Sequence, residues 1–142
     1  PTSRREIADV RSADGIAAPS ASIGQRVVTE WDIDPARVET YPYPFTPTPG
    51  YLAVQPGSDS LVVTFVGRLE VRKGVENLAR AVPLVRRAVP GARFRFVGGT
   101  LASRNPAVTM EAHLKRQLAK HADAVEFLGR RPQEELPGLL AD

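Results

Sequence analysis

Apolar positions in the second half of the chain follow two repeating patterns. A near-continuous apolar run at residues 61–66 is typical of a parallel strand with helices on both faces, and two later runs, 92–97 and 125–129, which also contain charged residues, are predicted to be the next strands. After each run, apolar residues recur every three or four positions, which predicts helices over 74–89, 110–122 and 133–141. Strands that alternate with helices favour right-handed crossovers. The pattern therefore predicts an α/β fold with a Rossmann-like parallel sheet and flanking helices.

Individual residues refine the two longer helices. Pro83 lies within 74–89 and lacks a backbone donor, so we expect a kink there or two short helices. In 110–122, Leu114 and Leu118 fall on the inward face. The two histidines on this segment have no third ligand at metal-binding spacing, and we interpret them as surface residues: His113 and His121.

The first 45 residues predict a shorter β-α-β pattern after a polar lead-in or short helix at 1–14. The run 15–20 predicts a strand, and Ser20 is a natural N-cap for the helix that follows. We expect this helix to end near Trp31, which we interpret as a core or interface residue, and 37–41 to form a strand. One face of the helix carries Ile23, Val27 and Trp31.

Between these two parts, residues 41–57 contain five prolines and two glycines. Proline fixes φ and removes a donor, so we expect neither helix nor central strand here, but an extended, semi-rigid linker. We place a domain boundary in this stretch, with the first domain at 1–45, the linker at 46–59 and the second domain at 60–142. A long surface loop within a single domain is the alternative.

Composition excludes several classes of protein. The chain has 142 residues and no cysteine, so disulfides, thiolate nucleophiles and cysteine-bound zinc are ruled out. No run reaches the roughly 20 apolar residues of a membrane span. A net charge of +3 and an aromatic fraction of 6% give little support to nucleic-acid binding, and we expect no nucleic-acid partner.

The segment 65–74 carries the clearest candidate chemistry. It joins the end of a predicted parallel strand to the start of a helix, where ligands bind in open α/β sheets. Gly67 permits close backbone approach, while Arg68, Arg72 and Lys73 place three cations on one loop, an arrangement that suits a dianion such as pyrophosphate. The alternative is that Arg68 pairs with a nearby carboxylate and Arg72 is simply solvated. The segment is neither G-x-G-x-x-G nor a Walker A loop.

Residues 67–74 read G-R-x-x-x-x-K-G after an apolar strand, which resembles the signature of the retaining glycosyltransferases of family 4, also called group 1, with the GT-B fold. Four further segments agree with that family in order and spacing. They are A-D-G-I-A-A-P-S at 13–20, Y-P-Y-P-F at 41–45, the strand ending in G-G at 90–99, and F-L-G followed by E-E-L-P at 127–137. The resemblance covers nearly the whole chain.

The resemblance implies roles for particular residues. Arg68 and Lys73, with Gly67, would hold the diphosphate of a nucleotide-sugar donor. Further donor-pocket candidates are Arg72, Gly98, Gly99 and Arg130, the last near the nucleotide base. A tight turn is the alternative explanation for the two adjacent glycines. Such a basic clamp needs no metal or other cofactor, and the partners would be the donor and an acceptor saccharide, lipid or small molecule.

By the resemblance, the family's acidic E-x7-E motif should follow a further strand and loop after residue 142, and its N-terminal glycine-rich loop and acceptor-site histidine and aspartate should precede residue 1. We therefore expect an inactive internal fragment without catalytic residues, comprising the end of the acceptor-side N-terminal domain (1–45), the linker (46–59) and the first half of the donor-binding domain (60–142). Its incomplete sheet would expose strand edges through which copies can associate. We expect the full-length protein that contains this fragment to be cytoplasmic. Contact of its N-terminal domain with a membrane surface stays open.

Two other functions fit less of the sequence. A non-catalytic nucleotide-binding or regulatory module could use the same fold, since fold does not determine function. A polyanion-binding domain could use the arginine-rich surface, but it would need more net positive charge than +3. A downstream E-x7-E motif would favour the transferase over the regulatory module.

Overall fold

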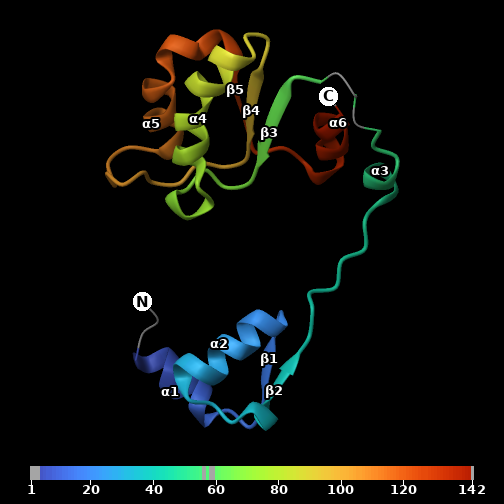
Figure 1. Cartoon of the computed structure of the whole chain (residues 1–142), viewed down its shortest axis with the longest axis vertical. Coiled ribbons are helices and arrows are strands. Elements are labelled where there is room, and N and C mark those ends of the chain that lie inside the picture. Colours follow the sequence, from blue (N-terminus) through green and yellow to red (C-terminus); the bar gives the residue numbers. More distant parts are fainter. Residues whose placement is uncertain (1–3, 56, 58–59, 142) are drawn as a thin grey trace. The chain divides into compact units, whose positions relative to one another are not determined.

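The computed structural model describes residues 4–55, 57 and 60–141, and the chain separates into two compact units, Pro1–Thr46 and Pro47–Asp142. Figure 1 shows the helices and strands within each unit. The ranges 1–45, 46–59 and 60–142 each include positions outside the described residues, among them Pro56 of the proline-rich stretch. The assignment of these ranges to separate domains of an enzyme stays a prediction.

The first unit is a small β-α-β arrangement. Strands β1 and β2 pair in parallel, with Ile16 opposite Val38. Ser20 caps the intervening helix as predicted, because its Oγ accepts a hydrogen bond from the Ile23 backbone N–H at 3.2 Å. The elements are α1 (Arg4–Ser12), β1 (Ile16–Ala18), α2 (Ala21–Trp31), the 3₁₀ turn η1 (Pro35–Arg37) and β2 (Val38–Thr40).

Helix α2 packs onto the strands through its smallest residue. Gly24 is its only residue described as buried, and a Cβ there would lie 3.4 Å from both the Ala18 Cβ and the Val38 Cγ1. Ile23, on the predicted apolar face, is 44% exposed, and Trp31 is half-buried. The strands therefore lie against the glycine, while the Ile23 side of the helix is open in this unit.

The proline-rich stretch contains one helical turn, α3 (Pro49–Leu52), so the expectation that no helix forms there is wrong. Pro49 occupies the first turn, where its missing N–H is not needed and its fixed φ suits the helix. The Tyr51 and Leu52 N–H groups donate to the Thr48 carbonyl, at 3.0 and 3.2 Å. Residues 41–48 have no regular secondary structure.

The second unit confirms the predicted α/β fold. Its three strands are parallel in the order β3-β4-β5, with Phe65 opposite Phe96 and Phe96 opposite Phe127. The strands are β3 (Val62–Val66), β4 (Arg93–Val97) and β5 (Val125–Gly129); the helical elements are η2 (Val71–Lys73), α4 (Val75–Ala88), α5 (Met110–Gln117), η3 (Ala119–Ala124), η4 (Gln133–Glu135) and α6 (Leu136–Ala141).

Two helices differ in part from their predictions. Helix α4 runs through Pro83 as one element, which excludes two short helices, while the alternative of a kink at Pro83 stays a prediction. Helix α5 ends at Gln117 rather than 122, and the 3₁₀ segment η3 follows it. The reason is local, because His121 has a non-helical φ of −127° and its N–H donates to Leu118 three residues back. Such tightened turns are frequent at helix ends.

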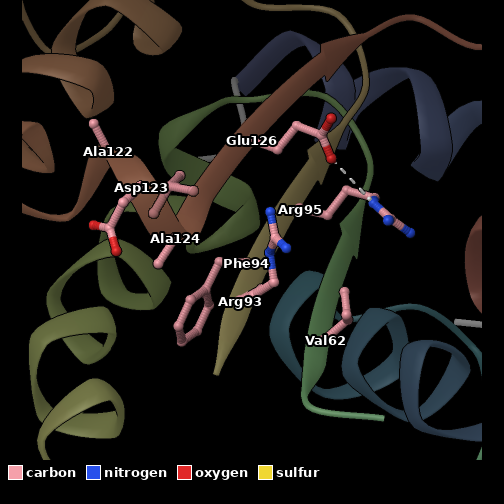
Figure 2. Close-up of a pocket in the computed structure, with 9 residues that line it drawn as sticks. Val62, Arg93, Phe94, Arg95, Ala122, Asp123, Ala124 and Glu126 are labelled. Carbon is pink, nitrogen blue, oxygen red and sulfur yellow. Dashed lines mark hydrogen bonds and ion pairs between the residues drawn. The ribbon is translucent and has the colours of Figure 1, made fainter. Parts of the chain in front are cut away.

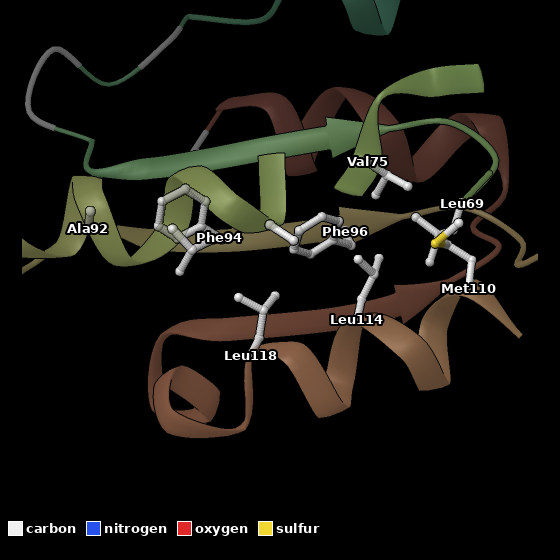
Figure 3. Close-up of a cluster of buried hydrophobic side chains, with 10 residues drawn as sticks. Leu69, Val75, Ala92, Phe94, Phe96, Met110, Leu114 and Leu118 are labelled. Carbon is white, nitrogen blue, oxygen red and sulfur yellow. The ribbon is translucent and has the colours of Figure 1, made fainter. Parts of the chain in front are cut away.

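The core lies between the sheet and the helices α4 and α5 (Figure 3). Phe94 and Phe96 project from the central strand toward Leu114 and Leu118, which are buried as predicted. The remaining fully buried members are Leu69, Val75, Ala79, Val82, Ala92 and Met110. On the other side, α6 is tied to the sheet where Arg95 donates to the Leu139 carbonyl at 3.2 Å.

Strand β3 is less covered than its apolar sequence predicts. Val63 and Val66 are 40% and 45% exposed, although the run 61–66 was expected to have helices on both faces. The cause is position, because β3 lies at the end of the strand order and pairs only with β4 among the described strands. No helix among the described residues is long and apolar enough to cross a membrane.

Candidate functional site

The three parallel strands lead into glycines at or near their carboxyl ends. Gly67 and Gly98 follow β3 and β4, and Gly129 is the last residue of β5; all three have positive φ, at 153°, 142° and 66°. The Gly67 N–H donates to the Val97 carbonyl at 2.9 Å, and the Gly98 N–H donates to the Gly129 carbonyl at 2.7 Å. These bonds hold the three strand ends together at one edge of the sheet.

Gly98 has no room for a side chain. A Cβ there would lie 1.9 Å from the Gly67 carbonyl oxygen, a distance that real Cβ atoms do not adopt. At Gly99 the neighbour is a side chain instead, because a Cβ would lie 3.3 Å from the Arg130 Cγ. The first glycine therefore permits close approach of two backbones, and the second permits close approach of the arginine.

A hollow of about 220 Å³ opens at this edge. It brings together five of the seven residues singled out from the sequence, namely Gly67, Arg68, Gly98, Gly99 and Arg130. Val66, Val97, Arg131 and Leu136 complete its lining. Glycines that expose their backbone and three arginines, Arg68, Arg130 and Arg131, line the same hollow, and such residue types suit the binding of an oxyanion.

Backbone hydrogen bonds fix the loop that carries Arg68. The Leu69 N–H donates to the Gly99 carbonyl at 2.8 Å, and the Leu101 N–H donates to the Leu69 carbonyl at 3.1 Å. Leu69 itself is buried in the core. The loop after β3 is thus joined to the loop after β4, and both contribute to the hollow.

Arg72 and Lys73 do not line the hollow. Both belong to the exposed 3₁₀ turn η2, which ends at Gly74 in the left-handed conformation with φ 71°. Within the described part of the chain, no ion pair or side-chain hydrogen bond is formed by Lys73. The structure therefore places these two cations beside the loop of Arg68, with the Lys73 ammonium on a flexible four-carbon stem.

Glu70 pairs with both arginines of this loop. Its Oε1 lies 3.4 Å from Arg68 Nη2 and 3.0 Å from Arg72 Nη2. The alternative that Arg68 pairs with a nearby carboxylate is confirmed for this structure, and the alternative that Arg72 is merely solvated is wrong. The sequence analysis did not single out Glu70, although an acidic residue between the two arginines was a visible signal.

Arg131 is a second residue that the sequence analysis missed. It lines the hollow next to Arg130, and its Nη1 lies 3.6 Å from Glu135 Oε2. The pair of arginines directly after the strand 125–129 could have indicated it. Glu135, in η4, lies outside the lining of the hollow.

A larger hollow, about 540 Å³, lies toward the amino ends of the strands (Figure 2). Most of the charged side chains that line it form ion pairs. Arg95 Nε is 3.4 Å from Glu126 Oε2, and Asp123 pairs with Arg86 at 2.8 Å. This hollow contains none of the glycine-bearing loops, which follow the opposite ends of the strands. We therefore place the candidate site at the carboxyl edge.

Glu76 forms a second charged cluster near the start of α4. Its buried carboxylate accepts a hydrogen bond from Arg104 Nε at 3.1 Å and lies 3.5 Å from His113 Nε2. His113 is thus half-exposed and faces a carboxylate, whereas the sequence indicated only a surface residue. Among the described residues, no group of three His, Asp or Glu side chains is arranged to hold a metal ion.

A family model matches the second unit of the chain. The family model described as "Glycosyl transferases group 1" matches residues 60–142, which include the whole described sheet of the second unit and the candidate hollow. No curated protein matches the chain.

Proposed function

The chain belongs to the group 1 glycosyl transferases, and from this premise we propose that the hollow at the carboxyl edge of β3, β4 and β5 binds the diphosphate of a nucleotide-sugar donor. The observation that carries the proposal is the convergence of Gly67, Arg68 and Arg130 on one hollow. In open parallel sheets, ligands bind outside the carboxyl ends of the strands. Guanidinium groups match phosphate oxygens in a planar, bidentate way.

The transfer breaks the bond between the anomeric carbon of the sugar and the diphosphate oxygen. The electron pair of that bond leaves with the nucleoside diphosphate, while an acceptor hydroxyl oxygen bonds to the anomeric carbon and loses its proton. Arg68 would stabilise the negative charge that develops on the leaving group. We propose that Lys73 reaches the same diphosphate through its flexible side chain, since it lies on the same loop.

Positive charge from these side chains can do the work that a metal ion does elsewhere, so we propose that this step needs no metal or other cofactor. We further propose the finer family assignment: a retaining, hexosyl-type enzyme of family 4 with the GT-B fold. In that assignment, residues 1–45 belong to the acceptor-side domain, 46–59 form the linker and 60–142 belong to the donor-binding domain. Arg72, Gly99 and Arg130 then border the donor pocket.

Titration calorimetry with UDP, GDP and ADP tests the clamp. We expect Arg68→Ala and Lys73→Ala each to lower the affinity for the nucleotide that binds by about tenfold or more, because hydrogen bonds to charged groups contribute about 1.5–3 kcal/mol. Arg87→Ala and Lys120→Ala are matched controls, since both residues are exposed and lie outside the hollow. Unchanged affinity in both Arg68→Ala and Lys73→Ala would contradict the proposal that these two residues bind the donor diphosphate.

A further inference from the structure

Glu70 is the only acidic residue in the loop 67–74. One of its carboxylate oxygens, Oε1, faces the Nη2 atoms of both Arg68 and Arg72, at 3.4 and 3.0 Å. The Glu70 side chain is 15% exposed, against 59% for Arg68 and 69% for Arg72. A shielded carboxylate therefore sits between two solvent-facing cations, and only Arg68 of the two lines the hollow.

The Glu70 carboxylate is held where it is by its backbone. Leu69, the preceding residue, is buried and hydrogen-bonded to Gly99 and Leu101 on the neighbouring loop. The Glu70 carbonyl accepts the Lys73 N–H at 3.1 Å, which closes the turn η2. An anion that binds Arg68 therefore meets a negative charge that the fold keeps close by.

The contact between Glu70 and Arg68 is an ion pair at 3.4 Å, whereas the contact with Arg72 at 3.0 Å is also a hydrogen bond. The Arg68 guanidinium thus keeps its donors available to a ligand. An oxyanion hydrogen-bonded to Arg68 would lie within about 9 Å of Glu70 Oε1, given ordinary hydrogen-bond lengths. This is close to the Debye length of about 8 Å at physiological salt, so the repulsion is only partly screened.

We propose that Glu70 makes the site discriminate between the nucleotide-sugar donor and the nucleoside diphosphate product. This inference rests on the proposed function. The diphosphate of a nucleotide sugar carries two negative charges, whereas the free nucleoside diphosphate carries about three at neutral pH, because the terminal phosphate has a second pKa of about 6. Glu70 repels the product more than the donor, so it weakens product inhibition and speeds product release.

The test compares wild type with Glu70→Gln in the intact protein, by titration calorimetry with three matched pairs: UDP and UDP-glucose, GDP and GDP-mannose, ADP and ADP-glucose. Each ligand charge at this distance changes affinity by about two- to threefold. We expect Glu70→Gln to raise the affinity for the nucleoside diphosphate by roughly tenfold and the affinity for the nucleotide sugar by roughly fivefold. The ratio of the two Kd values then shifts by about two- to threefold toward the diphosphate.

Two further variants serve as a control and as a second replacement of the same carboxylate. Glu126→Gln removes one negative charge from the same unit, near the amino end of β5, and should leave the ratio unchanged. Glu70→Asn, a shorter neutral amide, should reproduce the Glu70→Gln shift, so the result does not depend on one replacement. Thermal unfolding confirms that each variant is folded.

The outcomes separate this inference from the proposed function. If Arg68→Ala weakens binding but Glu70→Gln leaves the ratio unchanged, the Glu70 inference is wrong and the clamp stands. Weaker binding of both ligands to Glu70→Gln would also overturn it, because the carboxylate would then serve to orient Arg68. If the wild-type protein binds none of the three ligand pairs, or if Arg68→Ala and Lys73→Ala both bind nucleotide as wild type does, the proposed function is wrong. The inference about Glu70 is then wrong as well, because it rests on that function.

Discussion

At the end of β4, the position of a single carbonyl oxygen limits which residue can occupy position 98. A Cβ on Gly98 would lie 1.9 Å from the Gly67 oxygen, and the neighbouring atom is backbone that cannot rotate away. Its φ of 142° adds strain for any residue with a side chain. The shape of the hollow therefore depends on the absence of a side chain at position 98.

We expect Gly98→Ala to lower the free energy of unfolding by about 2 kcal/mol or more, because overpacking and a positive φ each cost about 1–3 kcal/mol. Urea denaturation measures the change. Gly138→Ala is the matched control, since a Cβ there meets no atom within 4 Å and alanine favours the helix. Equal stability of Gly98→Ala and wild type would contradict the close approach described here.

Carboxylates show the limit of sequence reasoning at the residue scale. Glu70 and Glu76 both lie near the start of α4, where acidic residues are expected to be solvated and to favour the helix dipole. In the structure each is shielded and paired: Glu70 with Arg68 and Arg72, Glu76 with Arg104 and His113. These partners come from the fold of the loops, which no local spacing indicates.

At the scale of single elements, helix α2 combines a predicted boundary with an unexpected packing face. Ser20 and Trp31 bound the helix as the sequence indicated. Gly24, rather than the larger apolar residues, contacts the strands. On the outer surface Arg26 and Glu30 form a bidentate pair one turn apart, with contacts of 2.9 and 3.2 Å.

This pair predicts a pH dependence. The hydrogen bond from Arg26 lowers the pKa of Glu30, slight desolvation opposes the shift, and the charge of Arg26 adds to it. A depressed pKa means that the pair stabilises the folded state above the unfolded pKa of Glu30 and stops doing so as pH falls through the folded pKa. Because both groups are exposed, the effect on stability is small.

Carboxyl-detected NMR titration checks the direction of that shift. We expect the Glu30 midpoint to lie below the ordinary glutamate value in wild type and to rise in Arg26→Gln. Gln25→Ala, a change at the neighbouring position on the same helix, should leave the midpoint where it was. A Glu30 midpoint unaffected by Arg26→Gln would show that the pair does not persist in solution.

At the scale of the whole molecule, the sheet of the second unit ends at β3 and β5 among the described strands. Val63 and Val66 on β3 keep substantial exposed apolar surface. Unpaired strand edges of this kind are templates for pairing with another chain. We therefore propose that copies of the protein associate through this edge.

Sedimentation velocity over a concentration series tests this association. We expect the weight-average mass to rise with concentration, and Val63→Lys to reduce the rise, because a lysine on an edge strand opposes pairing. Leu84→Lys is the control, since Leu84 is an exposed apolar residue on α4, away from the strand edge. A constant monomer mass over the series would rule the proposal out.

The order of the three strands and of the main helices in the second unit could be predicted from the amino-acid pattern alone, because strand-like apolar runs and helical spacing are local consequences of burial. The sequence also indicated the glycines after β3 and β4 and the cations of the loop 67–74. It was wrong about a helix in the proline-rich stretch, because Pro49 fits the first turn of a helix, where its missing N–H is not needed. At Pro83, the structure keeps only the alternative of a single helix.

Which of these residues come together depends on the three-dimensional fold. Parallel register and the bonds between Gly67, Val97 and Gly129 bring the loops after all three strands to one edge. This places Arg130 and Arg131 beside Arg68, leaves Lys73 outside the hollow, and sets Glu70 between two arginines. Convergence of residues far apart in the chain depends on strand pairing and loop conformation, and neither has a local signature in the sequence.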